Sequence, residues 1–116
     1  MISELKELKF DTDAGFGSRA RIGLVVLEND QTVEAELASL WPEGVAAFAT
    51  RIPMEDRVTA ETLLAMEVRI PEAAGLLPEI MGFDVIGYGC TSAATLIGEE
   101  RVSAALHRAH PEVPNT

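Results

Sequence analysis

Hydrophobic positions along this chain alternate between short continuous apolar runs and longer segments with helical spacing. Residues 21–27 (RIGLVVL) and 45–52 (VAAFATRI) are near-continuous apolar runs of strand length. Such runs are typical of strands that lie in a parallel sheet and are buried on both faces. A third run at residues 84–89 (DVIGYG) predicts another strand, and residues 111–116 predict the start of a fourth.

Between these runs, apolar residues recur every three or four positions, which indicates the buried face of a helix. The pattern predicts helices in four segments, at residues 32–40, 59–77, 93–97 and 99–109. Pro71 is expected to interrupt the second segment, because a proline inside a helix removes a hydrogen bond and clashes with the preceding turn.

The second helical segment begins with a candidate capping sequence. Thr59 is a suitable N-cap residue, since its hydroxyl can accept a hydrogen bond from the first turn. Thr62 occupies the position where a capping box usually has Glu or Gln, so we expect an incomplete box. The sequence therefore predicts a cap made by Thr59 alone.

Strands that alternate with helices indicate βαβ units with right-handed crossovers and a parallel sheet. We therefore predict an α/β fold with three αβα layers and a parallel sheet of about four strands. Residues 1–20 show no sustained period and predict an N-terminal arm that lies on the domain or on a partner subunit, whereas residues 21–116 form a single domain. Ligands of such sheets bind at the carboxyl ends of the strands, which here lead into the polar segments 28–32 and 90–92.

Composition and charge narrow the classes of function. The 116 residues are 47% hydrophobic, which is enough for a core, and they carry a net charge of −10. Because nucleic-acid binding requires clustered Lys and Arg, we expect no nucleic-acid partner. No apolar run has the length of a membrane span and the charged N-terminus has no signal-peptide pattern, so we expect no membrane partner and a cytoplasmic location. An anionic ligand would need local donors such as backbone N–H groups.

Cys90 is the only cysteine of the chain, which excludes an internal disulfide and a multi-cysteine zinc site. It lies between a predicted strand and a predicted helix, where backbone N–H groups can stabilise a thiolate and lower its pKa. Gly89 permits a sharp turn before it, and Thr91 and Ser92 offer hydroxyls and amides to a carboxylate. The alternative interpretation is a buried and unreactive cysteine. Whether Tyr88 faces this site or the core depends on the register of the strand.

The polar segment after the first strand is a second candidate. Asn29, Asp30, Gln31 and Thr32 could form the opposite wall of a pocket, but Asn, Asp and Thr also serve as helix N-caps without any ligand. His107 and His110 are predicted to lie on the surface. The chain contains neither the G-x-G-x-x-G fingerprint of dinucleotide sites nor the G-x-S-x-G elbow of hydrolases.

Two segments of the chain resemble a known family. Residues 21–36 (RIGLVVLENDQTVEAE) and 84–102 (DVIGYGCTSAATLIGEERV) resemble the aspartate/glutamate racemase superfamily, within it the branch of maleate cis-trans isomerases and arylmalonate decarboxylases. Residues 42–45 (PEGV) and 69–74 (RIPEAA) fit this resemblance as well. The ENDQTVE segment at residues 28–34 is similar to superfamily members encoded with ectoine breakdown genes.

The resemblance implies a particular fold and chemistry. The fold would be one flavodoxin-like half of a two-half architecture in which each half contributes one cysteine to a shared cleft. The activity would be a cysteine-based isomerisation, racemisation or decarboxylation of a small carboxylate or dicarboxylate, with no cofactor and no metal. Cys90 would act as acid, base or nucleophile, and Thr91 and Ser92 would bind a substrate carboxylate. The superfamily usually has a substrate-binding Asn in the loop after the first strand, and Asn29 or Asp30 would take its place.

The same resemblance raises the question of whether this chain acts alone. It matches the first half of the architecture, and two-base chemistry needs two thiols in different protonation states, whereas this chain has one. We therefore expect an incomplete site in a lone half, and a homo-oligomer that covers the exposed apolar surface. The alternative function is a non-catalytic module that binds a small carboxylate or only dimerises.

Overall fold

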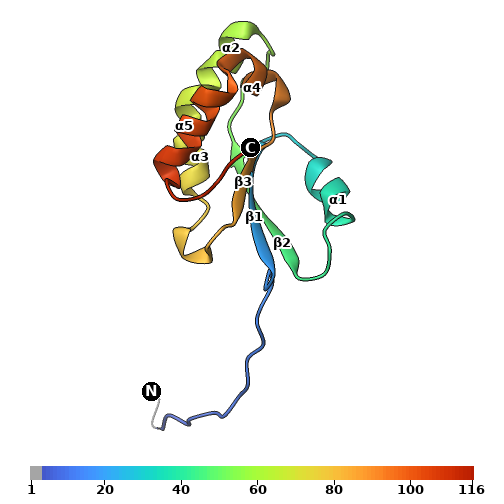
Figure 1. Cartoon of the computed structure of the whole chain (residues 1–116), viewed down its shortest axis with the longest axis vertical. Helices are drawn as coiled ribbons and strands as arrows, with labels where there is room; N and C mark the ends of the chain where they lie inside the picture. Colours follow the sequence, from blue (N-terminus) through green and yellow to red (C-terminus); the bar gives the residue numbers. More distant parts are fainter. Residues whose placement is uncertain (1–3) are drawn as a thin grey trace.

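The computed structural model describes residues 4–116 and shows an α/β fold built on a parallel sheet (Figure 1). Its strands are β1 (Ala20–Leu27), β2 (Val45–Ile52) and β3 (Val85–Tyr88), in the order β2-β1-β3. Both neighbours of the central strand β1 run parallel to it. The predicted fold class is therefore confirmed, and each strand lies within a residue or two of its predicted range.

The predicted fourth strand is reduced to one isolated bridge. Asn115 pairs with Ile86 in parallel, and the Ile86 amide donates to the Pro114 carbonyl at 3.0 Å. The Thr116 amide in turn donates to the Ile86 carbonyl at 3.1 Å. Prolines cannot donate to a strand ladder, so Pro111 and Pro114 restrict this segment to minimal pairing. Among residues 4–116 the sheet thus has three strands, one fewer than expected.

The helices follow the predicted order with different boundaries. They are α1 (Val33–Ala38), α2 (Ala60–Ala65), α3 (Ile70–Gly75), α4 (Thr91–Ile97) and α5 (Glu99–Ala109). The 3₁₀ turn η1 (Met66–Arg69) joins α2 to α3, and η2 (Glu79–Met81) precedes β3. Pro71 lies in the first turn of α3, where its missing N–H has no intrahelical role, so the interruption takes the form of η1.

The capping box of α2 is complete, which corrects the sequence prediction. The Thr62 amide donates to the Thr59 hydroxyl at 3.1 Å, and the Thr59 amide donates to the Thr62 hydroxyl at 2.9 Å. A threonine oxygen at the third helical position can therefore accept the bond that a Glu carboxylate usually accepts.

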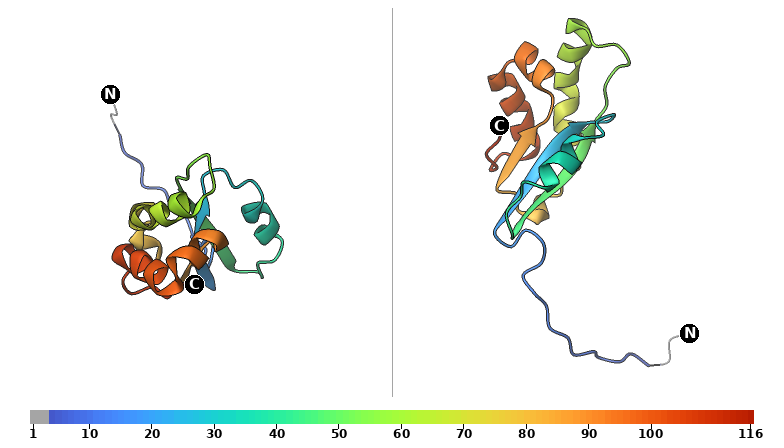
Figure 2. Two further views of the ribbon diagram at one scale, coloured as in Figure 1. Left: turned by 90° about the horizontal axis from the view of Figure 1, so that it is seen from above. Right: turned by 90° about the vertical axis from the view of Figure 1, so that its right-hand side faces the viewer.

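The sheet is covered unequally on its two faces. Helices α2 to α5 pack over one face and α1 lies over the other, as the view from above shows (Figure 2). The first face carries Val25, Ile52 and Ile86 into the main core, whereas α1 has no buried residue. The predicted three layers are present, but most of the apolar burial occurs on the side of α2 to α5.

His110 belongs to the core, so its predicted surface position is wrong. Its ring is 3% exposed, packs edge-on against Phe83 and places Nε2 2.9 Å from the Ala74 carbonyl. A buried imidazole is tolerated where a ring nitrogen has a hydrogen-bond partner. His107 is exposed, as predicted.

The residues before β1 form an extended segment without helix or strand. Residues 4–19 extend away from the domain, with the N-terminal end farthest from it, and nearly all of their side chains are exposed (Figure 1). The division into an arm at residues 1–20 and one domain at residues 21–116 remains a prediction, and residues 1–3 lie outside the described part. No helix within residues 4–116 has the length and apolar character required to cross a membrane.

Two strand glycines offer a matched test of the packing. A Cβ on Gly23 would lie 2.9 Å from Leu77 Cδ1 and 3.0 Å from Ile86 Cγ1, whereas a Cβ on Gly87 would meet only Leu24 Cδ2 at 3.4 Å. We expect Gly23→Ala to lower the free energy of unfolding by about 1–3 kcal/mol through overpacking. Gly87→Ala should be neutral or stabilise by up to about 1 kcal/mol. Urea unfolding measures both, and equal effects would contradict the described core.

Candidate functional site

The candidate site lies where β1 and β3 end at the same edge of the sheet. Val25 pairs with Tyr88, and the Gly89 amide donates to the Val25 carbonyl at 2.7 Å, which continues the pairing beyond the strand. A Cβ at Gly89 would lie 3.1 Å from that carbonyl, so glycine permits the close approach. Segments 28–32 and 90–92 therefore leave the sheet side by side, although no hydrogen bond within residues 4–116 joins them.

Cys90 is the N-cap residue of α4. Its backbone is extended (φ −122°, ψ 93°), its carbonyl accepts the Ala94 amide at 2.9 Å, and its side chain makes no capping bond within the described chain. The thiol is 7% exposed and belongs to the apolar core cluster. The sequence pattern predicted that this helix begins at residue 93, whereas α4 begins two residues earlier, at Thr91.

The first turn of α4 presents donors at the surface. The amides of Thr91 and Ser92 have no acceptor inside the helix, because the first N–H groups of any helix precede its first hydrogen bond, whereas Ala93 in the same turn is completely buried. Thr91 and Ser92 are exposed, and the Thr91 carbonyl accepts the hydroxyl of Thr95 at 2.8 Å. Free amides and two hydroxyls thus lie directly beside the buried thiol, an arrangement that suits a carboxylate.

The loop after β1 is arranged differently. Asp30 Oδ1 accepts the amides of Thr32 and Val33, both at 2.9 Å, and these two bonds hold the pKa of Asp30 below its ordinary value. Asp30 therefore holds the chain at the entry to α1, while the N-cap residue itself is Thr32, whose side chain makes no capping bond. Asn29 and Gln31 are exposed and have no side-chain hydrogen bond within residues 4–116.

Arg51, which belongs to β2, holds this loop in place through hydrogen bonds. Its Nη1 donates to the carbonyls of Leu27 and Asp30, at 2.9 and 3.0 Å, and its Nη2 forms an ion pair with Glu34. The Glu28 carboxylate accepts the Met54 amide at 2.8 Å. The loop is thus fixed to β2, and Asn29 and Gln31 remain available to a ligand.

The Tyr88 side chain lies on the face of the sheet that α2 to α5 cover. The sequence pattern had left its direction open. Its hydroxyl is buried and has no hydrogen-bond partner among residues 4–116. Burial raises the pKa of Tyr88, and its electrostatic interaction with the neighbouring Cys90 side chain raises it further. The phenol is therefore neutral near pH 7 and can act only as a donor or a neutral acceptor.

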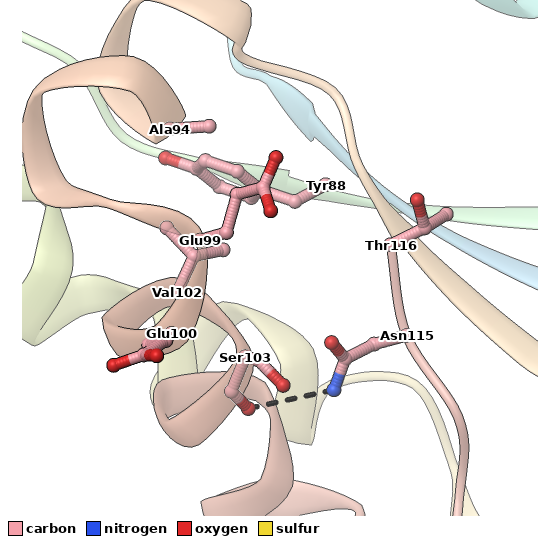
Figure 3. A pocket seen from close by; sticks show the side chains of 8 residues that line it. All are labelled: Tyr88, Ala94, Glu99, Glu100, Val102, Ser103, Asn115 and Thr116. Atoms are coloured by element: carbon pink, nitrogen blue, oxygen red, sulfur yellow. Dashed lines mark hydrogen bonds between the residues drawn. The ribbon is translucent and has the colours of Figure 1, made fainter.

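Tyr88 also lines a pocket of about 460 Å³ on the far side of β3 (Figure 3). The other walls come from α4, α5 and the last two residues, with Asn115 donating to the Ser103 carbonyl at 3.4 Å. Neither Cys90 nor the predicted binding residues line this pocket. Within residues 4–116 there is also no group of three or more His, Cys, Asp or Glu side chains that could hold a metal ion.

Solved structures of maleate isomerase share this fold. The crystal structure of the maleate isomerase Iso from Pseudomonas putida S16 matches with a TM-score of 0.62 and 24% identity, over 83% of this chain and 44% of that chain. A variant of the same enzyme with one cysteine replaced by alanine, solved with maleate, matches with a TM-score of 0.65 and 25% identity, over 83% of this chain and 43% of the other. No protein-family model matches the chain, and neither does any curated protein.

These matches establish an aspartate/glutamate racemase-like fold and confirm the fold predicted from the sequence resemblance. The chain spans less than half the length of the isomerases that it matches.

The role of Asp30 in holding the entry to α1 is testable through pH. Because its folded pKa is lowered, its contribution to stability is present above the ordinary value of 3.8 and is lost as the pH falls through the folded value. We expect Asp30→Ala to lower the melting temperature at pH 7, and the difference from wild type to shrink below pH 3.8. Asp30→Asn keeps an acceptor oxygen and should lose less at pH 7. Thermal unfolding across this range, with a difference that does not depend on pH, would refute the assignment.

Proposed function

We propose that this chain is one half of a cofactor-independent, cysteine-based isomerase, racemase or decarboxylase that acts on a small carboxylate or dicarboxylate. The observation that carries the proposal is the uncapped first turn of α4 beside Cys90, at the carboxyl edge of the sheet. The fold shared with maleate isomerase supports the same conclusion, since one of the matching structures holds maleate and lacks one cysteine.

The first turn of α4 would bind the substrate carboxylate. Its free amides carry the positive end of the peptide dipoles, and hydrogen bonds to an ionised acceptor are stronger than neutral ones. Thr91 and Ser92 would add their hydroxyls to these amides. The chain has a net charge of −10, so an anion needs such local donors to bind at all. Asn29 and Gln31, which leave the sheet beside this turn, would contact the far end of the ligand.

Cys90 would carry the chemistry. Its thiolate could remove a proton beside a carboxylate, or add to one carbon of a double bond while the electron pair moves to the other carbon. In the second route the former double bond becomes single and rotates, and expulsion of the thiolate restores the double bond in the other geometry. In either case the sulfur must leave its mostly buried position to reach the ligand.

A second candidate function is a binding module without turnover. The observation that favours it is the burial of the one thiol within the apolar core cluster, together with the absence of a second cysteine from the sequence. Tyr88 does not replace the missing thiol as a base, because its raised pKa keeps it protonated. The two functions share the carboxylate site and differ only in what Cys90 does.

Replacing Thr91 in two ways tests the amide contribution to binding. Thr91→Ala removes the hydroxyl and keeps the amide, whereas Thr91→Pro also removes the amide. Proline suits this first helical position, and the extended backbone of Cys90 is compatible with a following proline. We expect Thr91→Pro to weaken maleate binding roughly 10- to 100-fold relative to Thr91→Ala, as the loss of one charge-assisted hydrogen bond predicts. Isothermal titration calorimetry measures both affinities.

Circular dichroism of both variants shows whether α4 is retained. If Thr91→Pro and Thr91→Ala are correctly folded and bind maleate equally well, the proposed role of the α4 amides in carboxylate binding is wrong. The same titration with Cys90→Ala, combined with proton NMR of maleate incubated with the wild type, separates the two functions. Turnover by wild type that is lost in Cys90→Ala supports the enzyme. Unchanged binding by Cys90→Ala without turnover by wild type supports the module.

A further inference from the structure

The two edges of the sheet differ in whether their backbone groups are paired. At one edge, residues 114–116 form hydrogen bonds along β3. At the other edge, β2 pairs with β1 on its inner side, and no strand within residues 4–116 pairs with its outer side (Figure 2). The outer side of β2 is therefore the open edge of the sheet.

The hydrogen bonds at both ends of β2 show which of its backbone groups face β1. The Ala20 amide donates to the Gly44 carbonyl at 3.3 Å, and the Glu28 amide donates to the Ile52 carbonyl at 3.0 Å. Along a parallel ladder, every second residue directs both its amide and its carbonyl at the same neighbour. The even-numbered residues from 44 to 52 therefore pair with β1, and the odd-numbered ones face outward.

The outward backbone groups of β2 are almost all free. The Val45 amide donates back to the Pro42 carbonyl at 3.1 Å, which closes the turn before the strand. Within residues 4–116, the amides of Ala47, Ala49 and Arg51 have no hydrogen-bond acceptor. This edge can thus form a further ladder without breaking any hydrogen bond of the subunit.

The strand also lacks the features that usually keep an edge from pairing. Natural edge strands are protected by prolines, charged side chains or β-bulges. Residues 45–50 (VAAFAT) contain no proline and no charged residue. The pairing with β1 runs from Val45 to Ile52 without a break, so β2 has no bulge over its eight residues. A straight and uncharged edge of this length favours the addition of another strand.

We propose that the outer edge of β2 pairs antiparallel with β2 of a second copy of this chain, about a twofold axis at Phe48. In an antiparallel ladder, two opposite residues that face each other's backbone exchange a pair of hydrogen bonds. With the axis at Phe48, Ala47 of each copy lies opposite Ala49 of the other, and both residues face outward. The contact is self-complementary, as a twofold interface requires.

Charge and side chains favour a second copy as the occupant of this edge. The chain has a net charge of −10, but residues 45–50 carry no charge, so two copies pair here without like charges directly opposite. The nearest charges beyond this segment, at Glu43 and Arg51, have opposite signs. Phe48 is partly buried and packs edge-on against Phe83. In the dimer it faces Phe48 of the other copy, and such cross-strand aromatic pairs stabilise a sheet.

The proposed dimer leaves each candidate site to its own subunit. Because the two β2 strands run in opposite directions, the carboxyl edges of the two sheets lie at opposite ends of the combined sheet. The two Cys90 thiols therefore do not share a site, and the proposal is independent of the function proposed above.

Two proline substitutions provide a matched test. Ala49→Pro removes an outward amide and leaves the hydrogen bonds between β2 and β1, whereas Ala60→Pro places proline at the exposed first position of α2. We expect the wild type to sediment as a dimer at micromolar concentration. Ala49→Pro should raise the dimer dissociation constant roughly tenfold or more, because each dimer loses the same hydrogen bond twice. Ala60→Pro should leave it unchanged. A monomeric wild type, or equal weakening by both variants, would overturn the proposal.

Hydrogen exchange of the wild type tests the same contact without a substitution. The amides of Ala47 and Ala49 should exchange slowly in the dimer and rapidly after dilution to the monomer, whereas those of Phe48 and Thr50, which face β1, should stay protected in both. Rapid exchange at Ala47 and Ala49 in the dimer would place its interface elsewhere. Protection at every dilution would mean that a segment of the same chain covers the edge. Either result contradicts the proposal.

Discussion

The hydrogen bond from the Gly89 amide to the Val25 carbonyl fixes the position of the candidate site. It extends the β1–β3 pairing one residue past the strand, and glycine favours the close approach because a Cβ at this position would lie 3.1 Å from the Val25 carbonyl oxygen. Cys90 is thereby held against the core while α4 begins at the next residue. If this contact opened, the free amides of α4 would no longer lie beside the loop that follows β1.

The two loops at this edge differ in whether the first amides of the following helix have a side-chain hydrogen-bond acceptor. Asp30 uses its carboxylate to accept the first amides that lead into α1, whereas Cys90 leaves those of α4 unpaired. A capping side chain is worth about 1 kcal/mol, so a cysteine at this position forgoes stability that a serine or aspartate would supply. The contrast supports α4 as the anion site and Asp30 as a structural residue, with Asn29 and Gln31 as the available side chains of the loop.

Much of the fold could be predicted because parallel strands are buried on both faces and leave continuous apolar runs, as in β1 and β2. Details that depend on single hydrogen bonds could not. The burial of His110 depends on the Ala74 carbonyl, which lies 36 residues away, and the box of α2 depends on a hydroxyl that acts as a carboxylate would. For the site, the pattern located Cys90 at the strand end, but the side toward which Tyr88 points followed only from the register.

The central claim is that the first turn of α4 binds a small carboxylate, and amide NMR tests it residue by residue. In a titration of the wild type with maleate, the account predicts that the largest shifts occur at the amides of residues 91–93, with smaller ones at residues 28–32. Shifts centred instead on Ser103 and Asn115 would place the ligand in the pocket beyond β3. That result, or no shift at residues 91–93, would contradict the account.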